Sequence, residues 1–147
     1  MKIEGLDRVT MMVKNLDKAH EFFSNVLGVE FIEVKDPIVE TAGLRCSLSL
    51  DHQIELMSPA GPLTESCPPH IKRFAKLLED KDNVIVGLSF RVKDPTEAAA
   101  ELERKGVRIE SRFDLEQFCP VQNLKEVILR EEDTLGIMMS FVRYGRL

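Results

Sequence analysis

The sequence lacks any long apolar segment. No stretch approaches the roughly eighteen apolar residues of a transmembrane helix, and the opening MKIEGLDRV lacks a signal-peptide core. Positive charge is not in excess either, because 20 lysines and arginines face 25 acidic residues and the net charge is −5. Since phosphate binding requires a basic surface, the negative charge argues against a nucleic-acid partner, and the lack of an apolar segment argues against a membrane. They predict a cytoplasmic protein.

Cysteine is scarce, and it forms no paired motif. The three cysteines, Cys46, Cys67 and Cys119, are widely spaced and include no CxxC pair, so we expect free thiols rather than disulfides. The three histidines form no HxH or HxxxH pattern and do not predict a metal site. With 44% hydrophobic and 31% charged residues, the composition is that of a soluble globular protein.

A repeated pattern of strands and helices organises the chain. In the first half, the apolar spacing predicts a strand, a helix and three further strands, at residues 9–13, 16–27, 29–34, 44–50 and 53–57. Asn15 is the expected N-cap of the helix, and Gly28 is its expected stop.

The same order begins again after the proline-rich break SPAGPLTESCPP and a short predicted helix at residues 70–78. A strand at 84–92 precedes a helix that starts at Asp94 or Pro95 and stops at Gly106. A strand at 107–111 and a hairpin within 124–144 complete the second set. The order βαβββ therefore occurs twice, as in a duplicated module.

We therefore predict an α+β fold. Two βαβββ modules, residues 5–58 and 83–147, are expected to form a curved, half-open, eight-stranded cup within one domain of residues 1–147. Residues 59–82 form the predicted linker with its short helix.

Several segments carry a family resemblance. They are VTMMVKNLDKAHEFFSNVLGVEFIE, IELMSPAGPLTES, PHIKRFAKLLEDK, FRVKDPTEAAAELERKGVRI and KEVILREEDTLGIMMSFV. Together they resemble the vicinal oxygen chelate superfamily, which includes glyoxalase I, extradiol dioxygenases and bleomycin-resistance proteins. Within it, the segments look most like the methylmalonyl-CoA epimerase branch. The resemblance implies the cup-shaped fold and a homodimer.

The resemblance also implies four metal-ligand positions inside the cup, two from each module. In this chain they hold Arg8, Glu55, Gly87 and Ser140, and only Glu55 matches the family's chemistry. A guanidinium is a permanent cation without an acceptor, glycine has no side chain, and serine offers a weak neutral oxygen. Because a divalent metal needs several converging donors, we expect no metal and no cofactor.

Strand alternation predicts what lines the cup instead, because residues two apart share a face. The candidate ligand-binding residues are Arg8, Thr10, Glu55, Ser89, Arg91 and Ser140. We expect an Arg8–Glu55 ion pair where relatives hold the metal. The small Gly87 is expected to leave room for a ligand.

Three functions stay open at this point. The first is a metal-independent protein that binds a small, partly apolar, anionic ligand. The second is an epimerase, isomerase or lyase of the methylmalonyl-CoA epimerase or glyoxalase type, in which Glu55 is the base and Arg8 or Arg91 stabilises an enolate. Its second acid or base would have to be Glu126, whose face the sequence leaves uncertain, and this shortage places binding first. The third is a structural or regulatory module without a ligand.

Overall fold

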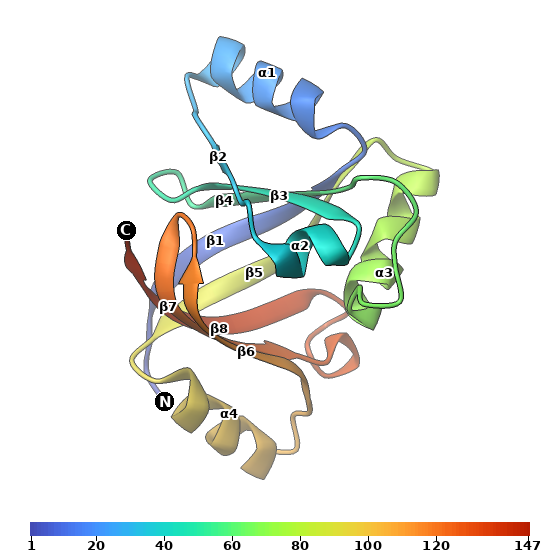
Figure 1. Ribbon diagram of the computed structural model, residues 1–147. Helices are drawn as coiled ribbons and strands as arrows, with labels where there is room; N and C mark the ends of the chain where they lie inside the picture. The colour runs from blue at the N-terminus through green and yellow to red at the C-terminus, as the bar shows by residue number, and fades with distance from the viewer. The chain divides into compact units, whose positions relative to one another are not determined.

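Eight strands, four from each half of the sequence, carry the fold (Figure 1). The computed structural model describes residues 1–147. They form two units, Val9–Val86 and Met1–Arg8 together with Gly87–Leu147. We call these the 9–86 unit and the 87–147 unit, and the latter includes the first eight residues.

The 9–86 unit contains the first set of elements. They are β1 (Ile3–Val13, which enters this unit at Val9), α1 (Leu16–Leu27), β2 (Ile32–Glu33), α2 (Pro37–Thr41), β3 (Leu44–Ser49), β4 (Ile54–Pro59), α3 (Pro69–Ala75) and the 3-10 turn η1 (Lys76–Glu79). Its strands are ordered β2-β3-β4-β1. β1 runs parallel to β4, with Thr10 beside Glu55, and the other neighbours are antiparallel.

The 87–147 unit repeats this plan. Its elements are β5 (Asn83–Val92, which enters this unit at Gly87), α4 (Pro95–Arg104), β6 (Ile109–Phe118), β7 (Val121–Leu129), the 3-10 turn η2 (Glu131–Asp133) and β8 (Met138–Arg146). The strand order is β5-β8-β7-β6, with β5 parallel to β8 and the other pairs antiparallel. The predicted α+β class and the double βαβββ order are confirmed.

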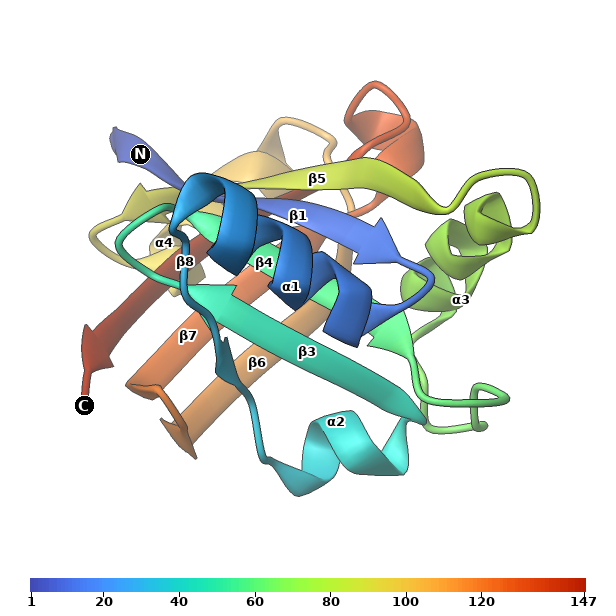
Figure 2. The same ribbon diagram turned by 90° about the horizontal axis from the view of Figure 1, so that it is seen from above.

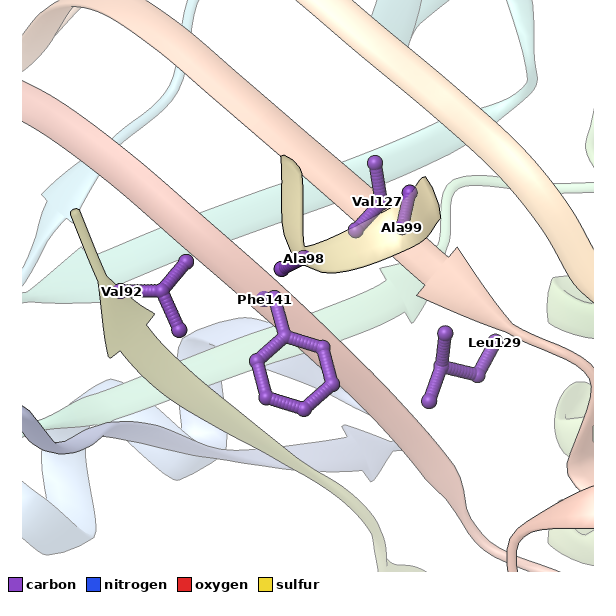
Figure 3. Close-up of a cluster of buried hydrophobic side chains, with 6 residues drawn as sticks. All are labelled: Val92, Ala98, Ala99, Val127, Leu129 and Phe141. Carbon is purple, nitrogen blue, oxygen red and sulfur yellow. The ribbon is translucent and has the colours of Figure 1, made fainter. Parts of the chain in front are cut away.

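Each unit packs one helix against its own strands. In the 9–86 unit, α1 lies over the strands of its own sheet (Figure 2), and its Leu16 is buried with Val13 and Leu56. In the 87–147 unit, Ala98 and Ala99 of α4 meet a cluster of buried side chains from β5, β7 and β8 (Figure 3). Burial of these apolar faces removes them from water and stabilises each helix on its sheet.

The predicted ends of both long helices are confirmed. The side chain of Asn15 accepts a hydrogen bond from the Lys18 N–H at 3.0 Å, and α1 ends at Gly28, whose φ of 67° suits glycine. Asp94 caps α4 in the same way, by accepting from the backbone N–H groups of its first turn. None of the helices is long and apolar enough to cross a membrane.

Several predicted boundaries are wrong. β1 begins at Ile3 rather than residue 9, and β6 continues to Phe118 rather than stopping at residue 111. The strand predicted at 29–34 is reduced to Ile32–Glu33, because the short helix α2 follows it almost at once. The α2 segment reads as a loop in sequence, yet Asp36 caps it by accepting a hydrogen bond from the Ile38 N–H at 2.9 Å.

Candidate functional site

Arg8 lies on β1 between two buried carboxylates. Its Nη1 donates to Asp7 Oδ2 and its Nη2 donates to Glu126 Oε1, both at 2.9 Å. Arg8 is 9% exposed, and its two partners are also buried. Charge-assisted bonds of this kind are short and directional. Both terminal nitrogens of the guanidinium are therefore engaged by anions within the 87–147 unit.

The network continues from Glu126 through two serines. The Ser140 Oγ lies 2.6 Å from Glu126 Oε1 and 2.7 Å from the Ser89 Oγ. A carboxylate only accepts, so Ser140 donates to Glu126 and the Ser89 hydroxyl donates to Ser140. Both serines are fully buried and adjacent in the parallel β5–β8 register. Ser140 thereby provides a hydrogen bond to a carboxylate that would otherwise be costly to bury, and Ser89 completes the hydrogen bonding of Ser140.

A third branch runs from Asp7 toward solvent. The Tyr144 hydroxyl donates to Asp7 Oδ1 at 2.9 Å, and the Arg91 Nη1 lies 3.9 Å from the same oxygen. Burial, together with the charge of Asp7, raises the pKa of Tyr144 to about 12. The Arg91 side chain is 50% exposed. We call this set the Arg8 cluster, and it comprises Asp7, Arg8, Ser89, Arg91, Glu126, Ser140 and Tyr144.

Glu55 belongs to a separate group in the 9–86 unit. The Thr10 Oγ1 donates to Glu55 Oε1 at 2.8 Å, and the Cys46 Sγ lies 3.8 Å from Glu55 Oε2. The parallel register places Thr10 directly beside Glu55, which explains the first contact. All three residues are buried. We call Thr10, Cys46 and Glu55 the Glu55 cluster.

Gly87 does not leave room for a ligand, contrary to the sequence expectation. A Cβ at this position would lie 2.8 Å from each of three Met138 atoms, namely Cβ, Cε and the carbonyl oxygen. Gly87 and Met138 are register partners in β5 and β8, so the methionine side chain lies over the glycine. The space that the missing side chain would open is filled by Met138.

The predicted site residues thus fall into the two clusters. Arg8, Ser89, Arg91 and Ser140 share the Arg8 cluster, whereas Thr10 and Glu55 share the Glu55 cluster. Arg8 and Glu55 lie in different units, and their pairing stays a prediction. Glu126, whose orientation the sequence left uncertain, lies in the Arg8 cluster.

Sequence reasoning missed Asp7 and Tyr144. The sequence analysis assigned no role to Asp7, whose side chain is fully buried. A signal was available, because Asp7 precedes an arginine at a position where the family resemblance implies an inward-facing ligand. Tyr144, the single tyrosine, gave no signal of its own.

Comparison with known proteins identifies a family for this chain. The family model described as the Glyoxalase/Bleomycin resistance protein/Dioxygenase superfamily matches residues 7–117. No curated protein matches the sequence significantly.

Solved structures with the same fold include several epimerases. The methylmalonyl-CoA epimerase of Mycobacterium tuberculosis is 25% identical, with a TM-score of 0.72 over 95% of this chain and 87% of that one. A Streptomyces coelicolor methylmalonyl-CoA epimerase in complex with 2-nitronate-propionyl-CoA is 18% identical, with a TM-score of 0.71 over 96% and 97% of the two chains. At 18% identity, the second likeness shows the fold alone.

Proposed function

This chain belongs to the glyoxalase/bleomycin resistance protein/dioxygenase superfamily, and we propose that it binds a small, partly apolar, anionic ligand without a metal ion. The observation that carries this proposal is the double ion pair of Arg8 with Asp7 and Glu126. Arg8 occupies the first of the four positions that the family resemblance implies for metal ligands. The Arg8 guanidinium is already paired with the carboxylates of Asp7 and Glu126 there, so these carboxylates are not available to coordinate a metal.

The other three positions do not supply a metal site either. Gly87 offers no donor and is covered by Met138. The Ser140 hydroxyl is engaged with Glu126, which leaves Glu55 as the single anionic donor of the four. No group of three or more histidine, cysteine, aspartate or glutamate residues is arranged to hold a metal ion. The residues present therefore do not fit the family's metal.

Side-chain replacement alone would not restore that metal site. A histidine at position 87 would place its Cβ 2.8 Å from the carbonyl oxygen of Met138, which is backbone and cannot rotate away. Arg8→His and Ser140→Glu would leave this steric obstacle in place. The backbone of β5 and β8 would have to move before four donors could converge.

The proposal that the protein binds a ligand rests on the buried polar side chains of the two clusters. Each cluster brings at least one hydroxyl and a carboxylate together on neighbouring strands, which is the arrangement that orients a small molecule in a mostly apolar site. The structural neighbours include epimerases solved with acyl-CoA compounds, so this fold accommodates such ligands in other proteins. We propose that the polar groups of the Arg8 cluster, within the 87–147 unit, contact this ligand.

Native mass spectrometry and elemental analysis of the purified protein test this function together. We expect no stoichiometric transition metal and a thermal midpoint that EDTA leaves unchanged. We also expect a bound small molecule, or an increase in thermal midpoint with members of a library of small organic acids. One metal per chain that disappears on Glu55→Gln would contradict the metal-independent reading. A library without a single stabilising compound would favour the structural module instead.

A second candidate is acid–base catalysis of the epimerase, isomerase or lyase type through Glu55. The observation in its favour is the Thr10 hydroxyl, which fixes one oxygen of a buried carboxylate and leaves the other beside the weak thiol donor of Cys46. Incubation with methylmalonyl-CoA in deuterium oxide tests it. Deuterium at the carbon between the two carbonyl groups, lost in Glu55→Gln, would establish catalysis, and its absence would leave binding as the function.

We also propose a cytoplasmic homodimer, as expected from the sequence. Light scattering checks the assembly, because a single chain has a mass of 16.7 kDa. A particle of about that mass at micromolar concentration would exclude the dimer.

A further inference from the structure

We propose that the acidic group of the ligand is a carboxylate bound by Arg91, not by Arg8, and that Asp7 and Gly5 position Arg91 for this contact. This inference rests on the proposed ligand-binding function and assigns one end of the ligand. It starts from the difference between the two arginines of the Arg8 cluster.

Arg8 is poorly suited to bind an external anion. Both of its terminal nitrogens donate to buried carboxylates at 2.9 Å, and the side chain is 10% exposed. An incoming anion would have to displace Asp7 or Glu126, which would leave a buried carboxylate without its partner. Such a rearrangement costs more than one new ion pair returns.

Arg91 differs in both exposure and engagement. Half of its side chain is exposed, and its ionic contact with Asp7 is 3.9 Å long, beyond hydrogen-bond distance. Asp7 is already paired with Arg8 and accepts a hydrogen bond from the Tyr144 hydroxyl. Most of the five N–H donors of Arg91 therefore stay available for a ligand.

The surroundings of Arg91 fix its direction. A Cβ on Gly5 would lie 3.3 Å from the Arg91 Nη2, so the guanidinium rests against the β1 backbone where a side chain is missing. On its other side, Nη1 points toward Asp7 Oδ1, which Tyr144 holds in place. A long side chain held at two points loses less entropy on binding than a free one. The Arg91 guanidinium is thus already oriented before a ligand binds.

A carboxylate suits this arrangement better than other anions. The planar fork of a guanidinium pairs with the two coplanar oxygens of a carboxylate. A phosphate carries more charge than a carboxylate, so the residual charge of Asp7, which shares the single cation of Arg8 with Glu126, would repel it more strongly. Arg91 and Ser89 lie two positions apart on β5 and share a face of that strand, and Ser140 lies beside Ser89 on β8. A small apolar acid anchored at Arg91 would therefore extend along β5 toward the serines.

The experiment is an amide NMR titration of the full chain with three probes: isobutyrate, its neutral isostere isobutyramide, and inorganic phosphate. We expect isobutyrate to bind up to about fivefold more tightly than isobutyramide, the effect of one partly exposed ion pair. Phosphate should bind more weakly than isobutyrate. Arg91→Gln should remove the preference for isobutyrate and leave the affinity for isobutyramide unchanged.

Arg112→Gln is the matched control, because Arg112 is another exposed arginine of the same unit and pairs with Glu103 on α4. It should keep the preference. Gly5→Ala tests positioning: its new Cβ pushes the guanidinium aside, so the ratio of the two affinities should fall while the affinity for isobutyramide stays the same. A loss of stability alone would weaken both probes equally.

Other results would overturn the assignment. Equal affinity for isobutyrate and isobutyramide, a preference that survives Arg91→Gln, or phosphate binding as tight as that of isobutyrate would each exclude a carboxylate anchor at Arg91. Absence of any binding by the three probes would exclude it as well. The proposed ligand-binding function is judged separately, by the organic acid library and the mass spectrum of the purified protein.

Discussion

Arg8 and Glu126 lie 118 positions apart in the chain and form a 2.9 Å ion pair with about nine-tenths of each side chain buried. Asp7, the neighbour of Arg8, completes the arrangement from the other side at the same distance. One cation thus compensates two buried anions, so its removal should affect stability more than the loss of any surface pair.

Arg8→Ala should lower the free energy of unfolding by about 3 kcal/mol or more, because it leaves Asp7 and Glu126 buried without their shared cation. Urea denaturation measures this change. Arg45→Ala is the control, since Arg45 pairs with Glu33 and Asp17 at a site where its side chain is one-third exposed, and it should cost about 1 kcal/mol or less. Equal losses in the two variants would show that the Arg8 cluster is solvated.

Gly87→Ala should destabilise the protein by roughly 1–3 kcal/mol, the usual cost of overpacking. The added methyl would meet Met138 at 2.8 Å, including its backbone oxygen. Met138→Ala in the same chain should restore only part of the loss, because the backbone contact remains. Gly145→Ala in β8 offers the comparison, since its nearest neighbour would be the flexible Gln122 side chain at 3.4 Å. A thermal midpoint that is unchanged in Gly87→Ala would refute the close packing.

Tyr144 should ionise near pH 12, above its ordinary pKa of 10.0. Because it is the single tyrosine and the chain has no tryptophan, phenolate absorbance reports this residue alone. The raised pKa means that the neutral phenol contributes to stability below about pH 10, and that this contribution is lost as the pH rises through about 12. A midpoint near 10 with the fold intact, by circular dichroism, would contradict the contact with Asp7.

One cysteine of three should react quickly with a thiol reagent. Cys119 is exposed, whereas Cys46 and Cys67 are buried, and burial also raises the pKa of the Cys67 thiol. Ellman's reagent should therefore modify about one thiol per native chain and all three in denaturant. Cys119→Ser should abolish the fast phase. Rapid modification of two thiols in the native protein would show that one of the buried positions opens.

The element order was predictable because it depends on local signals. Asn15, Gly28, Asp94 and the apolar spacing of the helices act within a few residues of themselves, and each performs its expected role. The extended start of β1 was missed because Gly5 and Asp7 are poor strand formers when considered alone. In the structure, the burial of Asp7 against Arg8 and Tyr144 compensates for that weak preference.

The sequence predicted which residues belong to the candidate site, but not which of them contact one another. Alternation along the strands predicted that Ser89 and Ser140 both line the cup, and the structure joins them by a hydrogen bond. The partners of Arg8 could not be deduced, because Glu126 reaches it through a β7 register that no local pattern reports. The filling of the space at Gly87 by Met138 is equally nonlocal, since it depends on which residues of β5 and β8 face each other.

The cation between Asp7 and Glu126 is encoded in the gene. It is present as soon as the chain has been translated, and it requires no ion uptake, delivery protein or loading step. A guanidinium also keeps its charge throughout the physiological pH range, so neither chelators nor mild acid can remove it. The presence of this cation therefore depends on protein synthesis alone, and growth in metal-depleted medium should leave it intact.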